Sequence, residues 1–107
     1  MTFSIAKQYT DTPGPRYRRQ GEFSGEQFRE EHLENLFNSY KMNREPIEID
    51  LDGTFGYPTS FLEEAFGGLA RIHPESEVLN AFIFTAREQP SLVEEIKNDI
   101  LNARKTR

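Results

Sequence analysis

The chain has 107 residues, 36% of them hydrophobic, and a formal net charge of −5 at pH 7. This length supports one hydrophobic core but not two, so we expect residues 1–107 to form a single domain. With no cysteine and two isolated histidines, the chain lacks the residues of a disulfide, a thiolate nucleophile or a typical zinc site, so we expect no metal and no cofactor.

Charge and hydropathy also exclude classes of partner. The acidic balance argues against binding to nucleic acid, which usually requires a basic face. No apolar run approaches the ~20 residues of a membrane span. The first ten residues lack the charged start and long apolar stretch of a signal peptide. We therefore expect a cytoplasmic protein that does not associate with a membrane.

The first part of the chain predicts a strand, a loop and a helix. Alternating apolar and polar residues predict a short strand over 2–6. Two prolines and a glycine exclude regular structure at 12–15. Ser24 and Gln27 have the spacing of a capping box, so a helix is expected to begin near residue 25 and to end between 41 and 44.

The middle of the chain predicts a strand, a tight loop and a second helix. An apolar run predicts the strand at 47–51, and Asp52 with Gly53 predicts a turn directly after it. Ser60 and Glu63 repeat the capping-box spacing at the start of a helix that reaches about residue 72. A hydroxyl at the start of a helix that follows a strand and a sharp loop is suited to presenting a reactive or anion-binding group.

The last part of the chain predicts one more strand and one more helix. A connection at 75–79 leads to a buried strand at 81–84. Ser91 and Glu94 form a third capping-box spacing, which predicts the start of the last helix. The order β-α-β-α-β-α indicates an α/β fold with a small sheet of three or four strands, mixed or mostly parallel, packed with about three helices. Residues 16–23 are the candidate for the fourth strand, at an edge.

Two segments together resemble a known family: GPRYRRQGEFSGEQFR (14–29) and IDLDGTFGYPTSFLEEAFGGL (49–69). They resemble a bacterial and phage family of STAS-like domains of unknown function, over roughly residues 3–100. The resemblance implies a STAS-like sheet, distantly similar to that of the anti-sigma-factor antagonists. It also implies a regulatory protein-interaction module rather than an enzyme.

The resemblance places a candidate phosphorylation site at Thr59 or Ser60. In the regulatory STAS proteins a Ser or Thr at this position is phosphorylated by a partner, so a histidine-kinase-type ATPase or a Ser/Thr kinase is the implied partner. The antagonists' Asp before the hydroxyl and Gly after it are replaced here by Pro58 and Phe61. We expect the partner to contact the residues around these hydroxyls, namely Gly56, Tyr57, Pro58, Phe61, Glu63 and Glu64. Both glutamates would repel an added phosphate.

The arginine-rich segment supports a different function. Guanidinium groups bind phosphates and carboxylates through paired hydrogen bonds, so an anion-binding site is expected from Arg16, Arg18, Arg19 and Arg29. The protein would then be a small-ligand sensor for a nucleotide or another anion. The simpler interpretation is that these arginines pair with nearby glutamates such as Glu22, Glu26 and Glu30.

An enzymatic function has less support in the sequence. Asp50 and Asp52 would share a strand face, and a carboxylate pair can bind Mg²⁺ or transfer protons. However, Asp52 precedes Gly53 and is better explained as a turn residue. We expect no catalytic residue and no enzymatic activity.

Overall fold

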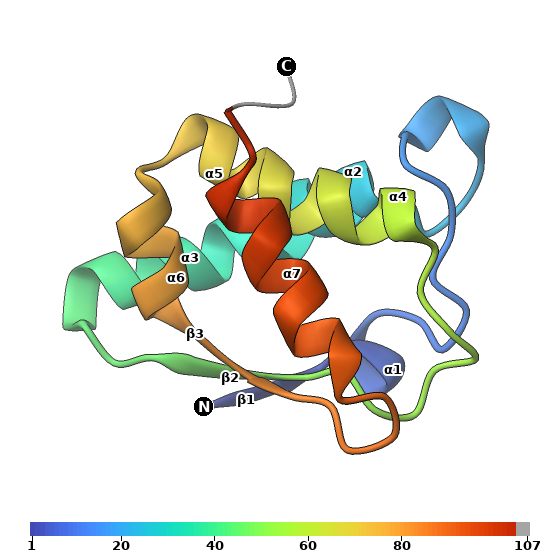
Figure 1. Ribbon diagram of the computed structural model, residues 1–107, viewed down its shortest axis with the longest axis horizontal. Helices are drawn as coiled ribbons and strands as arrows, with labels where there is room; N and C mark the ends of the chain where they lie inside the picture. Colours follow the sequence, from blue (N-terminus) through green and yellow to red (C-terminus); the bar gives the residue numbers. More distant parts are fainter. Residues whose placement is uncertain (105–107) are drawn as a thin grey trace.

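The computed structural model describes residues 1–104, and its three strands form one parallel sheet. The strands are β1 (Thr2–Ser4), β2 (Ile47–Asp50) and β3 (Phe82–Thr85), with β2 in the centre (Figure 1). In the register of the sheet, Phe3 is paired with Ile49, and Ile49 with Phe84. The predicted α/β class and small sheet are confirmed.

The predicted fourth strand is not part of this sheet. Within residues 16–23 the chain instead forms a short 3-10 turn, η1 (Arg18–Gln20). The Arg18 backbone N–H donates to a Glu26 carboxylate oxygen at 3.0 Å, and the Tyr17 N–H donates to the Gln20 side chain at 2.9 Å. These local bonds satisfy backbone groups that a sheet edge would otherwise require.

The helices include two long continuous ones, each with a wider π-helical turn in the middle. The first consists of α2 (Gly25–Phe28), η2 (Arg29–Leu33) and α3 (Glu34–Asn43). The second consists of α4 (Thr59–Leu62), η3 (Glu63–Gly67) and α5 (Gly68–Ile72). The remaining helices are α1 (Ile5–Gln8), α6 (Glu75–Ala81) and α7 (Ser91–Leu101). The three predicted helices are these two long ones and α7.

The sequence did not predict the short helices α1 and α6. Residues 75–79 were expected to be a connection, but Pro74 ends one helix and begins the next, and α6 buries Val78 and Ala81. Acidic residues in its first turn, Glu75 and Glu77, favour a helix start. A helix of seven residues contains too few apolar positions for periodicity to distinguish it from a loop.

Of the three predicted helix caps, only the first forms. The Ser24 hydroxyl accepts the Gln27 backbone N–H at 3.0 Å, and the helix begins at Gly25 as expected. The helices expected to be capped by Ser60 and Ser91 begin instead directly after Pro58 and Pro90, and neither serine caps. The proline takes the N-cap position of each helix, so both serines become helical residues.

The long helices and α7 lie on one side of the sheet (Figure 1). Apolar residues that point to that side are buried, such as Phe3, Ile47 and Ile49, whereas Glu48 and Asp50 alternate with them on the other side. The core continues into the helical layer through a group of fully buried aromatic rings: Phe28, Phe37, Phe61 and Phe66. Within residues 1–104, no helix has the length and apolar character needed to cross a bilayer.

Candidate functional site

The loop between β2 and α4, residues 51–58, is fastened to the segment that follows β3. The Asp52 carboxylate accepts the backbone N–H groups of Arg87 at 3.2 Å and of Glu88 at 3.0 Å. In return, the Gly53 N–H donates to the Glu88 carboxylate at 2.9 Å. Gly53 has a φ of 93°, a conformation that favours glycine. Asp52 therefore anchors the predicted turn.

Phe55 projects from the tip of this loop and is 86% exposed. Its backbone is nevertheless held, because its N–H donates to the Asp11 carbonyl at 2.9 Å. Gly56 turns the chain at a φ of 129°, and the Tyr57 hydroxyl donates to the Leu51 carbonyl at 2.8 Å. The loop thus presents an exposed aromatic ring from a fixed backbone. The sequence analysis missed Phe55, although an aromatic residue between two turn glycines has little access to the core.

A hollow of about 160 Å³ lies beside Phe55. The loop contributes Thr54, Gly56 and Tyr57 to its lining, and the segment after β3 contributes Glu88, Gln89 and Leu92. Burial raises the pKa of the Tyr57 phenol. Of the predicted partner-binding residues, Gly56 and Pro58 are exposed and Tyr57 is half-buried.

The two candidate phosphorylation sites lie in the first turn of α4. Thr59 is exposed and Ser60 is half-buried. Neither hydroxyl caps the helix, because the Pro58 carbonyl accepts the N–H groups of Phe61 at 3.0 Å and Leu62 at 3.3 Å. Both hydroxyls are thus unused by the helix start.

Three of the predicted partner contacts, Phe61, Glu63 and Glu64, are wholly or partly buried. Phe61 is fully buried and stacks on Phe28, with ring centroids 5.8 Å apart and an interplanar angle of 22°. Glu64 is buried and Glu63 half-buried. Phe61 is a core residue, and the expectation that it is a surface contact is not met, because helix periodicity turns it towards α2.

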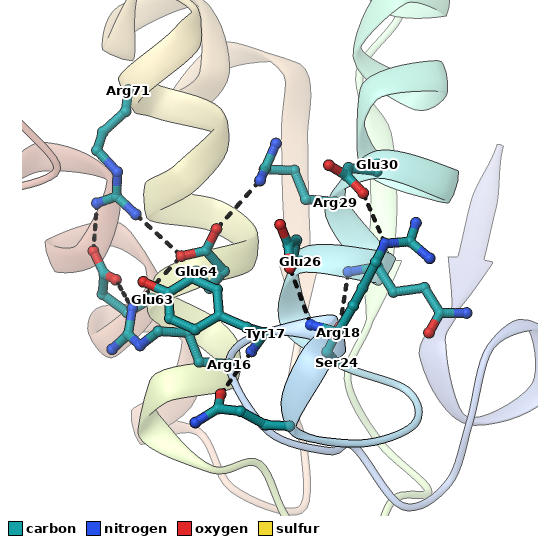
Figure 2. A network of polar contacts seen from close by, with 12 residues as sticks. Arg16, Tyr17, Arg18, Ser24, Glu26, Arg29, Glu30, Glu63, Glu64 and Arg71 are labelled. Atoms are coloured by element: carbon teal, nitrogen blue, oxygen red, sulfur yellow. Dashed lines mark hydrogen bonds and ion pairs between the residues drawn. The ribbon is translucent and has the colours of Figure 1, made fainter.

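Five charged side chains form a compact network between the loop before α2, the two long helices and α7 (Figure 2). The members of this arginine–glutamate network are Arg16, Arg29, Glu63, Glu64 and Arg71. Glu63 pairs with Arg16 through one oxygen and with Arg71 through the other, at 2.6 Å. Glu64 pairs with Arg29 at 3.2 Å and lies 3.7 Å from Arg16 and 3.6 Å from Arg71. Each carboxylate is therefore shared by several guanidinium groups.

Two glycines make room for this network inside the second long helix. A Cβ at Gly68 would lie 2.8 Å from Arg29 Nε, and a Cβ at Gly67 would lie 2.9 Å from a Glu63 carboxylate oxygen. The sequence analysis did not predict Arg71. Its spacing from Glu63 and Gly67 on one helical face was a signal that could have identified it.

The pKa values of Glu63 in the network and of Asp99, its neighbour on α7, are both shifted. Burial raises the pKa of Glu63, but hydrogen bonds from Arg71 and Arg16 outweigh this effect and hold it below its usual range. On α7, burial raises the pKa of Asp99 to about 6, and the charges of Glu95 and Glu63 add to the effect. Asp99 Oδ2 is buried and accepts no hydrogen bond from the described residues.

The four predicted anion-binding arginines do not converge on one point. Arg16 and Arg29 meet at Glu64, whereas Arg18 pairs with Glu30 at 2.8 Å. Arg19 lies over the Tyr17 ring, with its guanidinium carbon 4.9 Å from the ring centroid. An anion at this site would have to compete with the carboxylates that already occupy Arg16, Arg18 and Arg29.

Across residues 1–104, acidic and histidine side chains do not gather in any group of three or more suited to a metal ion. The two histidines have other contacts: His73 Nε2 lies 2.9 Å from Glu34, and His32 packs among aromatic rings. Burial lowers the pKa of His32. The candidate site consists of the loop at residues 51–58, which we call the Phe55 loop, and the first turn of α4, where Phe55 and Thr59 are exposed.

Comparison with family models finds a match to the STAS-like domain of unknown function over residues 24–92. The matched residues include the first long helix, the Phe55 loop and most of the network, but they begin after Arg16, Arg18 and Arg19 and so are fewer than the resemblance suggested. No curated protein and no solved structure matches the chain. Because the family match covers well over half of the chain, the protein belongs to the family of STAS-like domains of unknown function.

Proposed function

We propose that this protein is a regulatory protein-interaction module whose partner docks on the Phe55 loop and the first turn of α4. The observation that carries the proposal is the 86% exposure of Phe55 on a backbone fixed by hydrogen bonds. Large aromatic side chains are enriched at the centres of protein interfaces, where they fill pockets of the partner. A fixed loop also loses little conformational entropy on binding.

The test is quantitative affinity enrichment with the purified chain as bait, followed by mass spectrometry. Phe55→Ala should reduce recovery of a true partner about tenfold, the loss expected for an interface anchor. Met42→Ala is the matched control, because Met42 is equally exposed, at 88%, but lies near the end of α3, away from this loop. Equal recovery by wild type and Phe55→Ala would contradict the proposal.

We further propose that Thr59 or Ser60 is phosphorylated by that partner, a histidine-kinase-type ATPase or a Ser/Thr kinase. Thr59 is exposed, and both hydroxyls are unused by the helix start. The predicted repulsion by Glu63 and Glu64 is weakened, because both carboxylates are paired with arginines. A phosphate there would add a charge of about −1.5 to −2 to the proposed docking surface and change its affinity for the partner.

This switch is tested by intact-mass measurement after incubation with the enriched partner and ATP. Wild type should gain one phosphate, and Thr59→Val or Ser60→Ala should abolish the gain. Thr59→Glu and Ser60→Glu should alter partner recovery in the absence of ATP. An unmodified wild-type mass together with unchanged recovery by both glutamate variants would refute the switch without affecting the docking proposal.

A further inference from the structure

One face of the sheet has no covering layer within residues 1–104. In a parallel sheet the crossover helices normally cover both faces, because the strands are buried on both sides. Here the helices of both crossovers and α7 lie on the same side (Figure 1). The side chains that alternate with the core residues form the opposite surface, which we call the open face: Thr2, Glu48, Asp50, Ile83 and Thr85. Ser4 is in register with Asp50 but is buried, because it caps α1.

A carboxylate is fixed at the centre of the open face. The hydroxyls of Thr2 and Thr85 donate to the two oxygens of Glu48, at 2.9 Å and 2.5 Å, from the strands on either side. These hydrogen bonds hold the pKa of Glu48 below its usual range. Asp50 lies two residues further along the same strand, and one of its oxygens accepts the Asp52 N–H at 3.0 Å. The open face therefore carries two oriented carboxylates on its central strand.

An exposed apolar side chain lies beside these carboxylates. Ile83 on β3 is in register with Glu48 and is 58% exposed. The preceding residue of the same strand, Phe82, is buried in the core on the other face. Burying such a side chain in a complex would contribute about 1–2 kcal/mol. The combination of an apolar residue and fixed acids defines the chemistry of a complementary partner.

The surroundings extend the acidic character of the open face. At the carboxyl ends of the strands it continues into a shallow hollow of about 480 Å³, whose lining adds Asp11, Asp52 and Glu88 and the basic residues Lys7 and Arg87. Side-chain carboxylates thus outnumber basic side chains by five to two on the open face and this hollow. A second copy of the chain would bring like charges together, which disfavours self-association through this face.

We infer that the open face binds a basic amphipathic helix of a partner polypeptide. Strand residues two apart are separated by about 6.6 Å, and helix residues four apart rise by about 6 Å. Two lysines or arginines at positions i and i+4 of the helix can thus face Glu48 and Asp50, while an apolar residue of the helix covers Ile83. The strand part of this surface contains no residue of the 51–58 loop, whereas the adjoining hollow is lined in part by Asp52 and Gly53 of that loop.

The test uses two synthetic peptides of about 18 residues, which is five helical turns. The first has an apolar stripe flanked by lysines at i, i+4 spacing, and the control peptide has glutamate at each lysine position. Titration of the ¹⁵N-labelled full chain with the first peptide should shift the amide resonances of residues 47–50 and 82–85. The control peptide should produce no shifts.

Surface variants sharpen the result. Ile83→Asp, and Glu48→Gln combined with Asp50→Asn, should each weaken binding about tenfold, a loss of about 1.4 kcal/mol. Phe55→Ala should bind the peptide as wild type does, so failure here and failure of the proposed docking at the Phe55 loop are distinguishable. Circular dichroism confirms that each variant is folded.

Three outcomes would overturn the inference. The first is an absence of shifts, or equal shifts with the acidic peptide. The second is a set of shifts confined to residues 52–60, which would assign the peptide to the Phe55 loop. The third is a concentration-dependent dimer in sedimentation that Ile83→Asp dissociates, which would show that a second copy covers the open face.

Discussion

Glu64 is the most buried carboxylate of the arginine–glutamate network, with a side chain only 9% exposed. Its oxygens lie within 4 Å of all three arginines, of which Arg29 is 13% exposed. Removing one partner of a buried pair leaves an uncompensated charge, which costs more than the pair itself contributes. A single neutral substitution in the network should therefore lower the free energy of unfolding substantially.

We expect Glu64→Gln to lower the free energy of unfolding by about 3 kcal/mol. The matched control is Glu77→Gln, because Glu77 pairs with Arg44 at 2.9 Å on an exposed surface, where such pairs contribute little to stability. Urea unfolding of both variants measures the difference. A loss from Glu64→Gln no larger than that from Glu77→Gln would show that the network is not a stabilising unit.

Asp99 should make the folded protein less stable as pH rises, whereas a carboxylate whose pKa is lowered by a salt bridge makes it more stable. Its pKa is raised from 3.8 to about 6 in the folded protein, so the folded state binds more protons than the unfolded state between these values. The contribution of Asp99 to stability therefore falls as pH rises from about 4 to 6 and remains unfavourable above pH 6.

Asp99→Asn removes this penalty, and the variant should be more stable than wild type by roughly 1–2 kcal/mol at pH 7.5, since solvent screens part of the effect. The advantage should shrink towards pH 4. Glu94→Gln, at an exposed position on the same helix, is the control substitution. The measurement is urea unfolding at several pH values, and a constant difference across the range would contradict the assignment.

The helices differ in whether a side chain accepts the backbone N–H groups of their first turn. At α2 the cap is a side chain, Ser24, whereas α4 and α7 begin after prolines with no side-chain cap. Three serines with the same spacing to a following Gln or Glu therefore have different energetic roles. The spacing of a capping box is a local signal, and a neighbouring proline overrides it.

Ser24→Ala should consequently lower the free energy of unfolding by about 1 kcal/mol, through the loss of the 3.0 Å bond to the Gln27 N–H. Ser91→Ala is the matched control and should change stability by less than about 0.5 kcal/mol, because Ser91 caps nothing. Thermal unfolding followed by circular dichroism at 222 nm compares the two. Equal losses would mean that the observed cap is not what stabilises the start of α2.

Seen as a whole, the molecule is a one-sided sheet with a single layer of helices, and one hydrophobic cluster joins all of its long elements. The cluster includes Ile49 in the central strand, Phe28 and Phe66 in the two long helices and Ile96 in α7. A core shared in this way leaves no part of residues 1–104 with an independent core of its own. That residues 1–107 form one domain remains a prediction, and it has a consequence for unfolding.

A single domain of this kind should unfold cooperatively. Since the chain has four tyrosines and no tryptophan, tyrosine fluorescence reports tertiary structure and far-ultraviolet circular dichroism reports the helices. The two urea transitions should coincide in midpoint and slope. Separated transitions would show that one long helix or α7 unfolds independently.

Much of the fold was accessible from local sequence patterns. The strand at residue 47, the helix start at Ser24 and the turn at Gly53 each depend on residues only a few positions apart. The alternation of strands and helices then restricted the topology, because parallel strands require crossover connections. The short helix α6 was missed because seven residues carry too little periodic signal.

The candidate site depended on contacts that no local pattern encodes. Phe61 and Phe55 are both aromatic and six residues apart, yet one is fully buried against Phe28 and the other is 86% exposed. Arg16 and Arg29 reach carboxylates 47 and 35 residues away in the chain. Their partners were not predictable from spacing, since nearer glutamates were equally plausible by charge alone.

The sequence by itself thus determined the class of fold, the order of the three strands, the two long helices and α7, and the family motif, because propensity, periodicity and turn chemistry act over a few residues. Tertiary structure alone decided which aromatic ring is presented to solvent, which arginines are neutralised and which face of the sheet stays open. Those outcomes depend on how segments 30 to 50 positions apart meet around the core, and only packing specifies that.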